Sequence, residues 1–258
     1  MPSSYLFLFC TGSLVGFFSG LLGIGGGILM FPLLLYMPPL LGIEPIGVKD
    51  ITGLTMVQGF FASLSALALY RRQRLVSRSL VTTFGLPLFL SSFIGALVSG
   101  HISDNVLLFL FGIMALVAAV MMLIPRSYAH DDLTEDKVRF NKAIAVLTSV
   151  FVGTSLGMVG QGGAFLVIPI LLYVLRIPLR VALGSTLGIG LFSSTAGLAG
   201  KIATGQVPFL LAAALLIGAI PFARLGSIVS QRSGTTVLRW LLAFIISATA
   251  VKVWIDIF

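Results

Sequence analysis

Two glycine-rich segments are the places where this sequence could hold a ligand. They read Gly23-Ile24-Gly25-Gly26-Gly27 and Gly160-Gln161-Gly162-Gly163-Ala164, and a short apolar run follows each. Glycine weakens helices, so each segment is predicted to break one. The short helix after the break would then point free N–H groups and its positive dipole end at a bound anion. The predicted substrate contacts are Gly23, Gly25, Gly26, Gly27, Gly160, Gln161, Gly162 and Gly163, with close helix packing as the alternative role of the glycines.

A second paired feature lies at the start of a predicted spanning helix in each half. The first half reads Asp50-Ile-Thr52-Gly53-Leu-Thr55, and the second reads Val181-Ala-Leu-Gly184-Ser185-Thr186. Hydroxyl groups at these positions can donate hydrogen bonds to an anion or cap the free N–H groups of the helix, and both roles stay open. The contacts predicted from this feature are Thr52, Gly53, Thr55, Gly184, Ser185 and Thr186.

Several other polar side chains lie in or beside apolar runs. Gln58 and Gln161 must find partners inside the protein, and Gln161 is the better placed for substrate because it lies within a glycine-rich break. Asp50 is the acidic residue nearest the predicted site, where it either serves as a helix cap or loop carboxylate or carries a coupling ion. Lys201 and Arg180 lie at helix ends and are interpreted as topology anchors.

The apolar runs lack the residues that catalysis would need. They contain neither His nor Glu, and Cys10 is the only cysteine of the chain. Intramembrane hydrolysis needs a base beside a nucleophile or a metal cluster, so an enzyme is not expected, and no cofactor or metal is predicted. The basic residues are scattered between apolar runs rather than gathered in one patch, which argues against nucleic acid as a partner.

The composition identifies the class of protein. Of 258 residues, 58% are hydrophobic and 9% are charged, far from the balance of a soluble domain. Most apolar runs are long enough to cross a bilayer core of about 30 Å, whereas the runs at 27–37 and 164–175 are too short. The sequence therefore predicts an all-α polytopic membrane protein. The runs lie at 5–22, 27–37, 51–70, 79–100, 105–125, 142–159, 164–175, 182–200, 207–225 and 236–255.

The chain is internally duplicated. Residues 16–36 align with 153–173 at an offset of 137, with ten of 21 positions identical, and residues 53–68 align with 184–199 at an offset of 131. The predicted organisation is a first transmembrane repeat at 1–125, a hydrophilic cytoplasmic linker at 126–141 and a second transmembrane repeat at 142–258. Each repeat is predicted to contain a glycine-broken helical hairpin and three spanning helices.

The basic residues indicate how the repeats are oriented. If each broken segment is a hairpin, 13 of the 16 Lys and Arg residues fall in or beside cytoplasmic loops and 3 lie outside, whereas single crossings give 10 against 6. The positive-inside rule favours the hairpins. Three crossings per half is an odd number, so the second repeat is predicted to enter the membrane inverted, with both termini outside. Inverted repeats with broken helices are typical of transporters that bind substrate near the midplane.

These motifs also resemble a known family. The run Gly16-x3-Gly20-x2-Gly23-x-Gly25-Gly26-Gly27-x4-Pro32, its second copy ending Gly160-x-Gly162-Gly163-x5-Pro169, and Leu183-Gly184-Ser185-Thr186-Leu187 are similar to the sulfite exporter TauE/SafE (TSUP) family. The resemblance covers nearly the whole chain. It implies export of small sulfur oxyanions or sulfonates, such as sulfite or sulfoacetate, across the inner membrane of a prokaryote. The chain departs from the family pattern at Asp50 to Thr55 and at Gln161, which leaves the specific anion open.

The sequence thus predicts an inner-membrane transporter that exports small sulfur-containing anions by alternating access. An inside-negative potential favours anion efflux by about 2.3 kcal/mol per charge per 100 mV, without a coupled ion. The alternatives are an importer of a sulfur compound, a proton-coupled carrier that uses Asp50, and an anion channel with the same helix-end site. The expected partners are the anionic substrate and the lipid bilayer; the oligomeric state stays open, with a homodimer among the options.

Overall fold

The computed structural model describes residues 2–124, 140–160 and 165–257, and every regular element within them is helical. The elements are α1 (Pro2–Leu22), α2 (Gly27–Leu40), α3 (Val48–Arg72), α4 (Arg78–Ser99), α5 (Asp104–Leu123), α6 (Lys142–Val159), α7 (Val167–Pro169), the π-helix η2 (Ile170–Val174), α8 (Leu179–Ala203), α9 (Phe209–Arg232) and α10 (Thr235–Ile257). Eight helices in these ranges are long and apolar enough to cross a membrane, and α2 is a shorter apolar helix. The protein is a multi-pass α-helical membrane protein, as the composition predicts.

The second short limb differs from its prediction. The sequence predicts a short helix after the second break, in the apolar run at 164–175, but the α-helical part is only Val167–Pro169 and a π-helix follows it. Residues 175–178 alone join this limb to α8, whereas residues 41–47 join α2 to α3. The chain makes this short connection through a wide turn, in which the N–H of Ile177 donates to the carbonyl of Leu171 at 2.8 Å. The helix-dipole argument therefore applies to α2, which has 14 residues, and not to α7.

The first broken segment is a hairpin. Ser4, in the first turns of α1, and Ile43, just beyond α2, line one pocket at the same end of the bundle. At the other end, the hydroxyl of Tyr70 near the end of α3 lies 3.3 Å from the carbonyl oxygen of Gly20 near the end of α1. Thus α1 and α3 run parallel, and α2 returns toward the end where α1 begins. This is the hairpin that the sequence predicts for the first half.

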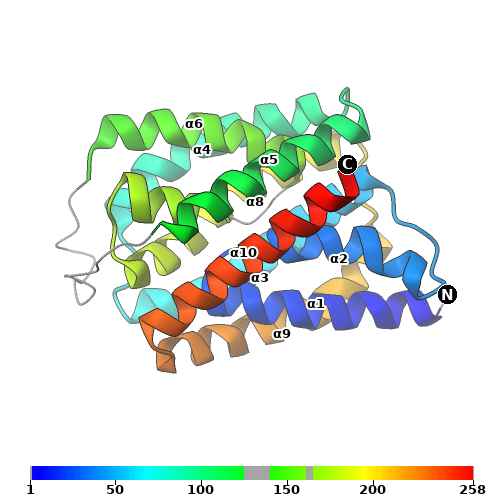
Figure 1. Ribbon diagram of the computed structural model, residues 1–258, viewed down its shortest axis with the longest axis horizontal. Helices are drawn as coiled ribbons and strands as arrows, with labels where there is room; N and C mark the ends of the chain where they lie inside the picture. Colours follow the sequence, from blue (N-terminus) through cyan, green and yellow to red (C-terminus); the bar gives the residue numbers. More distant parts are fainter. Residues whose placement is uncertain (1, 125–139, 161–164, 258) are drawn as a thin grey trace.

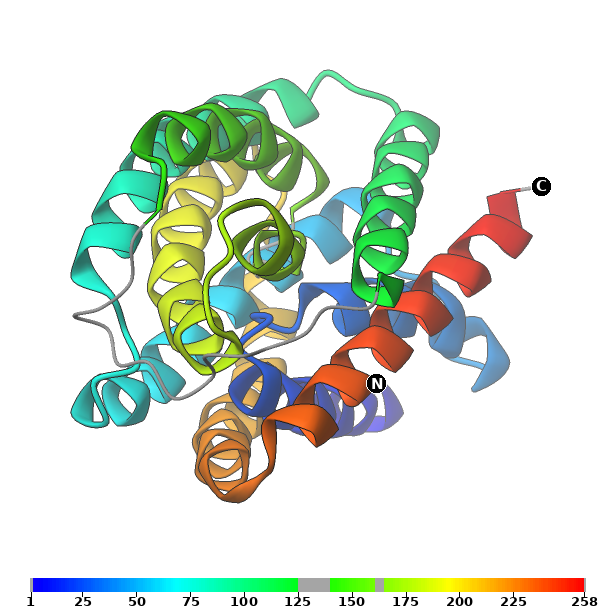
Figure 2. The same ribbon diagram turned by 60° about the vertical axis from the view of Figure 1, so that its left-hand side comes forward.

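Each half packs a helix closely along a helix of the other half. In Figure 1, α1 lies along α9 and α6 lies along α4, and the turned view of Figure 2 shows the same pairs. Small residues permit this approach: a Cβ on Gly16 would lie 2.5 Å from the carbonyl oxygen of Ala219, and one on Gly157 would overlap the backbone of Ser92. Both pairs run parallel, so the two halves interlock.

The central pair α3 and α8 runs antiparallel. Gly53 at the start of α3 packs on Gln206 just beyond the end of α8, and Gly184 near the start of α8 packs on Leu75 just beyond the end of α3. The two contacts are equivalent, because Gly184 lies 131 residues after Gly53 and Gln206 lies 131 residues after Leu75. An inverted repeat would produce this arrangement, although the inverted repeat itself stays a prediction.

The basic residues divide between the two ends of the bundle. The ends of α3 and α9 meet where Gln73 donates to Gln231 at 2.6 Å, and Arg180 at the start of α8 donates to Ser233 at 3.0 Å. We call this the arginine-rich end; it carries Arg71, Arg72, Arg74, Arg78, Arg176, Arg180, Arg224, Arg232 and Arg239. At the opposite end, the lysine end, Lys49 donates to the carbonyl of Gly100 at 3.1 Å.

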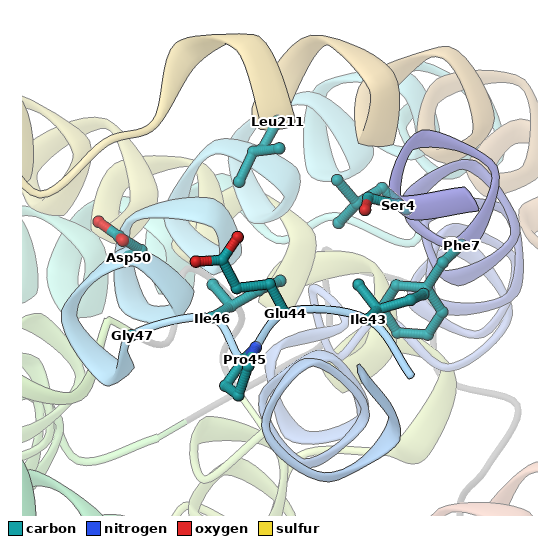
Figure 3. A pocket seen from close by; sticks show the side chains of 10 residues that line it. Ser4, Phe7, Ile43, Glu44, Pro45, Ile46, Gly47, Asp50 and Leu211 are labelled. Atoms are coloured by element: carbon teal, nitrogen blue, oxygen red, sulfur yellow. The ribbon is translucent and has the colours of Figure 1, made fainter. Parts of the chain in front are cut away.

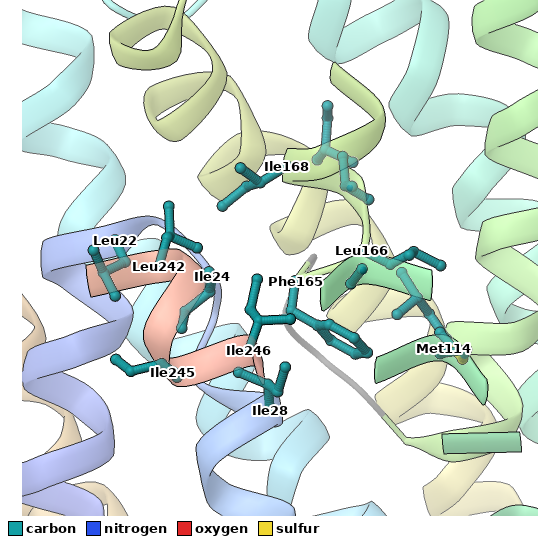
Figure 4. Packing of buried hydrophobic residues seen from close by; sticks show 14 of the residues in the cluster. Leu22, Ile24, Ile28, Met114, Phe165, Leu166, Ile168, Leu242, Ile245 and Ile246 are labelled. Carbon is teal, nitrogen blue, oxygen red and sulfur yellow. The ribbon is translucent and has the colours of Figure 1, made fainter. Parts of the chain in front are cut away.

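A continuous apolar core fills the space between the two broken segments. Figure 4 shows Ile24 from the first break, Ile28 from the first turn of α2, Phe165 just after the second break and Ile246 from α10 directed into the same region. All four side chains are fully buried. The ring of Phe111 in α5 contacts the ring of Phe165, with 6.1 Å between centroids. This core closes the middle of the bundle in the conformation described.

Candidate functional site

The first glycine-rich break reverses the chain by left-handed backbone conformations. Gly23, Gly25 and Gly26 have φ angles of 65°, 64° and 79°, values that residues with a Cβ adopt only at a cost. α1 ends at Leu22 and α2 begins at Gly27. The sequence therefore locates this break correctly, and the structure gives a backbone reason for the glycines.

The two breaks contact the central helix pair at opposite ends. A Cβ on Gly23 would lie 2.5 Å from the carbonyl oxygen of Leu183 in α8, and one on Gly160 would overlap Thr52 in α3. Leu183 and Thr52 are corresponding residues, 131 positions apart. Gly23 and Gly160 are thus close-packing positions, as are Gly53 and Gly184. Gln161, Gly162 and Gly163, also predicted to contact substrate, lie outside the described residues.

The predicted hydroxyl contacts are buried and engaged with the backbone. Thr52 donates to the carbonyl of Lys49 at 2.7 Å, and Thr186 donates to that of Ala182 at 2.6 Å. The Thr55 hydroxyl lies against the carbonyls of Ile51, Thr52 and Gly160. Ser185 accepts from the N–H of Ser77 at 3.0 Å. In this conformation these hydroxyls form hydrogen bonds with backbone groups of the protein. None of them caps its helix, because the N-caps of α3 and α8 are Gly47 and Pro178.

Gln58 is the polar group that this region leaves without a partner. Its side chain is fully buried, and neither amide atom has a hydrogen-bond partner within the described ranges. A Cβ on Gly26 would lie 2.8 Å from both the amide nitrogen and the amide oxygen, so the amide is directed at the first turn of α2. The sequence identified Gln58 as an amide in need of a partner but preferred Gln161; the structure places Gln58 at the first break.

The hydroxyl of Ser19 adds a second unpartnered polar atom nearby. It is buried on α1 one turn beyond Val15, whose side chain faces Gly26, and it too has no hydrogen-bond partner in the described part of the chain. Helix geometry leaves the N–H groups of Gly27 and Ile28 without intrahelical acceptors. The Gln58 amide and the free N–H groups therefore meet at the N-terminus of α2, about midway along α3, where a ligand could satisfy them.

Lys201, interpreted from the sequence as a topology anchor, is a fully buried lysine. Its side chain is fully buried, and its ammonium donates to the hydroxyl of Ser99 at 2.7 Å, the amide oxygen of Gln206 at 2.8 Å and the carbonyl of Met158 at 3.3 Å. The acceptors are neutral, so the charge faces the carboxyl ends of α4 and α6 rather than a carboxylate. Met158 lies two residues before Gly160, which places the cation beside the second break.

Asp50 faces away from both breaks. It lies in the first turn of α3, beyond the N-cap Gly47. Figure 3 shows its carboxylate with Glu44 at a pocket of about 230 Å³ that Ser4 and Phe7 also line. Thr52, which packs on Gly160, is two residues further and so about 200° around the helix. The structure does not bring Asp50 together with the other predicted site residues.

Comparison with known proteins agrees with the architecture. The family model described as sulfite exporter TauE/SafE matches residues 8–253. The chain is 32% identical over 255 residues to a probable membrane transporter protein of Xylella fastidiosa, covering 94% of this chain and 92% of the relative. It is 28% identical over 249 residues to one of Methanocaldococcus jannaschii, covering 93% and 91%, and 24% identical over 258 residues to one of Bacillus subtilis, covering 94% of each.

No solved structure gives a significant match to this chain. The family match nevertheless spans both halves, from within α1 to near the end of α10, and includes both glycine-rich breaks. The chain belongs to the sulfite exporter TauE/SafE family of membrane transporters.

Proposed function

We propose that this transporter moves a small sulfur-containing anion, such as sulfite, sulfoacetate or a related organosulfonate, out of the cell by alternating access. The observation that carries the proposal is the buried, unpartnered amide of Gln58 at the N-terminus of α2. An oxyanion bound there would accept from that amide and from the N–H groups of Gly27 and Ile28. Family membership supports the substrate class.

The charge of the protein interior favours an anion over a cation. Lys201 is buried among neutral acceptors, and the positive end of the α2 dipole faces Gln58. Ionisable residues at membrane depth usually mark a transport path, because burying their charge costs free energy. We assign Lys201 to the wall of the transport path at the lysine end of the bundle, where it would attract the anion.

Alternating access would use the two breaks. They lie at opposite ends of the α3–α8 pair, where Gly23 packs on Leu183 and Gly160 packs on Thr52. We propose that the halves are inverted repeats and that each break loosens in turn, so that the site opens first to one face and then to the other. The apolar contacts around Phe165 would close the path in the conformation described.

The direction of transport follows from the membrane potential and the charge distribution. The positive-inside rule assigns the arginine-rich end to the cytoplasm, so the chain termini and Lys201 would lie toward the outside of a prokaryotic inner membrane. An inside-negative potential then drives an anion outward without a nucleotide or a coupled ion. Import of a sulfur compound and channel conduction remain the competing functions.

Counterflow in proteoliposomes tests the proposal. Vesicles loaded with unlabelled sulfite, thiosulfate, sulfoacetate or sulfate are diluted into the labelled anion, and uptake is followed. A carrier accumulates label only when a substrate fills the vesicle, and we expect this for at least one sulfur anion. Voltage-driven current without such exchange would identify a channel, and exchange of none of the four anions would refute the substrate class.

A further inference from the structure

A cavity of about 800 Å³ opens at the arginine-rich end, between α3, α4 and α8. Arg71, Arg74 and Arg78 line it together with apolar residues that include Val81 and Gly188. The volume far exceeds what one small oxyanion fills, so an anion would enter with part of its hydration shell. None of the residues in this cavity belongs to the predicted substrate contacts.

The charge of this cavity is uncompensated in the described structure. The three arginine side chains are exposed, and the carboxylates that the structure describes, those of Glu44, Asp50 and Asp104, belong to the lysine end. A guanidinium offers a rigid pair of donors that fits two oxygens of an oxyanion. A cleft lined by one sign of charge also raises the local concentration of the opposite ion.

Arg74 occupies a backbone position that suits glycine better. Its φ is 55°, in the left-handed region that a Cβ disfavours. The corresponding residue of the second half, 131 positions later, is Gly205, with φ 69° at the same point beyond its helix. The positive-inside rule explains why this loop contains arginines. It does not explain why one of them occupies position 74, where the left-handed backbone disfavours a Cβ. Arg176 at the same end has a similar φ of 58° but does not line the cavity, so the strain at Arg74 supports a ligand role only together with its place in the cavity lining.

We propose that this cavity binds a small oxyanion, held by Arg74 together with Arg71 and Arg78, and recruits it to the arginine-rich face of the transporter. The cavity adjoins the central α3–α8 pair, since Gly188 in its lining lies one helical turn beyond Gly184, which packs on Leu75. The inference rests on the proposed function only in naming the transported sulfur anion as the occupant. The phosphate of an anionic lipid headgroup has the same chemistry and is the second source of such a group.

The test is sulfate and sulfite binding to purified protein in nanodiscs of phosphatidylcholine, measured by calorimetry at low ionic strength. Arg74→Gly removes the guanidinium and suits the backbone. Arg176→Gly is the matched control, because Arg176 has φ 58°, is exposed at the same end and does not line the cavity. We expect Arg74→Gly to weaken binding about tenfold, as loss of a charge-assisted contact does, and Arg176→Gly to leave it unchanged.

Phosphatidylglycerol nanodiscs distinguish the two sources. The negative surface of phosphatidylglycerol weakens sulfate binding by both proteins. If headgroups fill the cavity, the wild type loses more affinity in these discs than Arg74→Gly does. If the free anion is the occupant, the two proteins lose affinity by the same factor. Binding by Arg74→Gly at wild-type strength in both lipids, or an equal loss in Arg176→Gly, would overturn the inference. Sulfate binding could depend on Arg74 in a protein that exchanges no sulfur anion. That result would refute the proposed transport function and would still support the oxyanion site in this cavity.

Discussion

Tyr70 and Lys201 occupy the same place in the two halves, 131 residues apart, and make matching contacts. The Tyr70 hydroxyl lies 2.6 Å from the Ser230 hydroxyl and 3.4 Å from the Leu21 carbonyl. The Lys201 ammonium lies 2.7 Å from the Ser99 hydroxyl and 3.3 Å from the Met158 carbonyl. Ser99 and Ser230 are themselves a corresponding pair, as are Leu21 and Met158 at the offset of 137. The two halves thus share one pattern of polar contacts, which we call the polar brace: a side chain at the end of the central helix bonded to a serine hydroxyl and to a backbone carbonyl. Only the second half has a lysine in this position.

This relationship separates the charge of Lys201 from its bracing role. Lys201→Tyr installs the side chain that the other half already uses, so the hydrogen bonds can be kept while the charge is lost. We expect the variant to fold and to bind the transported anion at least tenfold more weakly, about 1.4 kcal/mol or more. Calorimetry on purified protein measures the affinity, and size-exclusion chromatography checks folding.

Tyr70→Phe is the control for the brace alone. It removes one buried hydroxyl, which should cost about 1 kcal/mol of stability and leave anion affinity as in the wild type. If Lys201→Tyr binds the anion normally, Lys201 serves only to join α8 to α4 and α6.

Gln58 should trade stability against binding. Gln58→Leu replaces a buried amide that has no partner in the described structure with an apolar side chain of similar size. Relief of the unpaired polar group should raise the midpoint of thermal unfolding, since such a group costs about 1–3 kcal/mol. Anion affinity should fall about tenfold, because the anion loses an amide donor.

The thermal unfolding midpoint and the anion affinity should be measured on the same preparation of Gln58→Leu. Higher stability with unchanged affinity would remove Gln58 from the site and show that its amide is a tolerated defect. Lower stability would mean that the amide has partners in the resting protein.

The sequence predicts the breaks well because they depend on local backbone chemistry. α1 and α6 end immediately before Gly23 and Gly160, where the glycines begin. The hydroxyl of Thr186 could also have been assigned from the sequence alone, since a threonine inside an apolar helix commonly donates to the carbonyl four residues earlier.

The environments of Gln58 and Lys201 could not be predicted in this way. Lys201 reaches Ser99 across 102 residues, and this contact exists only because α4, α6 and α8 meet at one end. Hydropathy places a lysine at a helix end at the membrane surface and carries no information on such a meeting. One signal was present, because the offset of 131 aligns Lys201 with Tyr70, an aromatic residue at the end of an apolar run.

Asp50 should be dispensable for transport. Asp50 lines the pocket that Glu44 and Ser4 also line, and it lies on the side of α3 opposite Thr52, which packs on Gly160. We therefore expect Asp50→Asn to keep the wild-type exchange rate and the wild-type dependence of that rate on pH, as measured in proteoliposomes. A rate that no longer responds to pH in the variant would instead identify Asp50 as the proton-coupling group.

The orientation in the membrane can be tested with single cysteines in a Cys10→Ser background. Glu44→Cys is at the lysine end and Arg72→Cys is at the arginine-rich end, and both positions are exposed. In intact cells a membrane-impermeant maleimide should label Glu44→Cys and spare Arg72→Cys until the cells are opened. The reverse pattern would invert the assignment from the positive-inside rule.

Gly26 should be more sensitive to a methyl group than any strained glycine in open space. Gly26→Ala combines the cost of a left-handed residue, about 1–2 kcal/mol, with overlap on Val15 and on the Gln58 amide, at 2.6 and 2.8 Å from the new carbon. Gly205→Ala is the matched control, because its φ of 69° is similar and nothing lies within 4 Å. Both alanine variants should lose stability by the strain, but only Gly26→Ala should lose anion binding in calorimetry. Equal affinities in the two variants would show that the anion binds away from the N-terminus of α2.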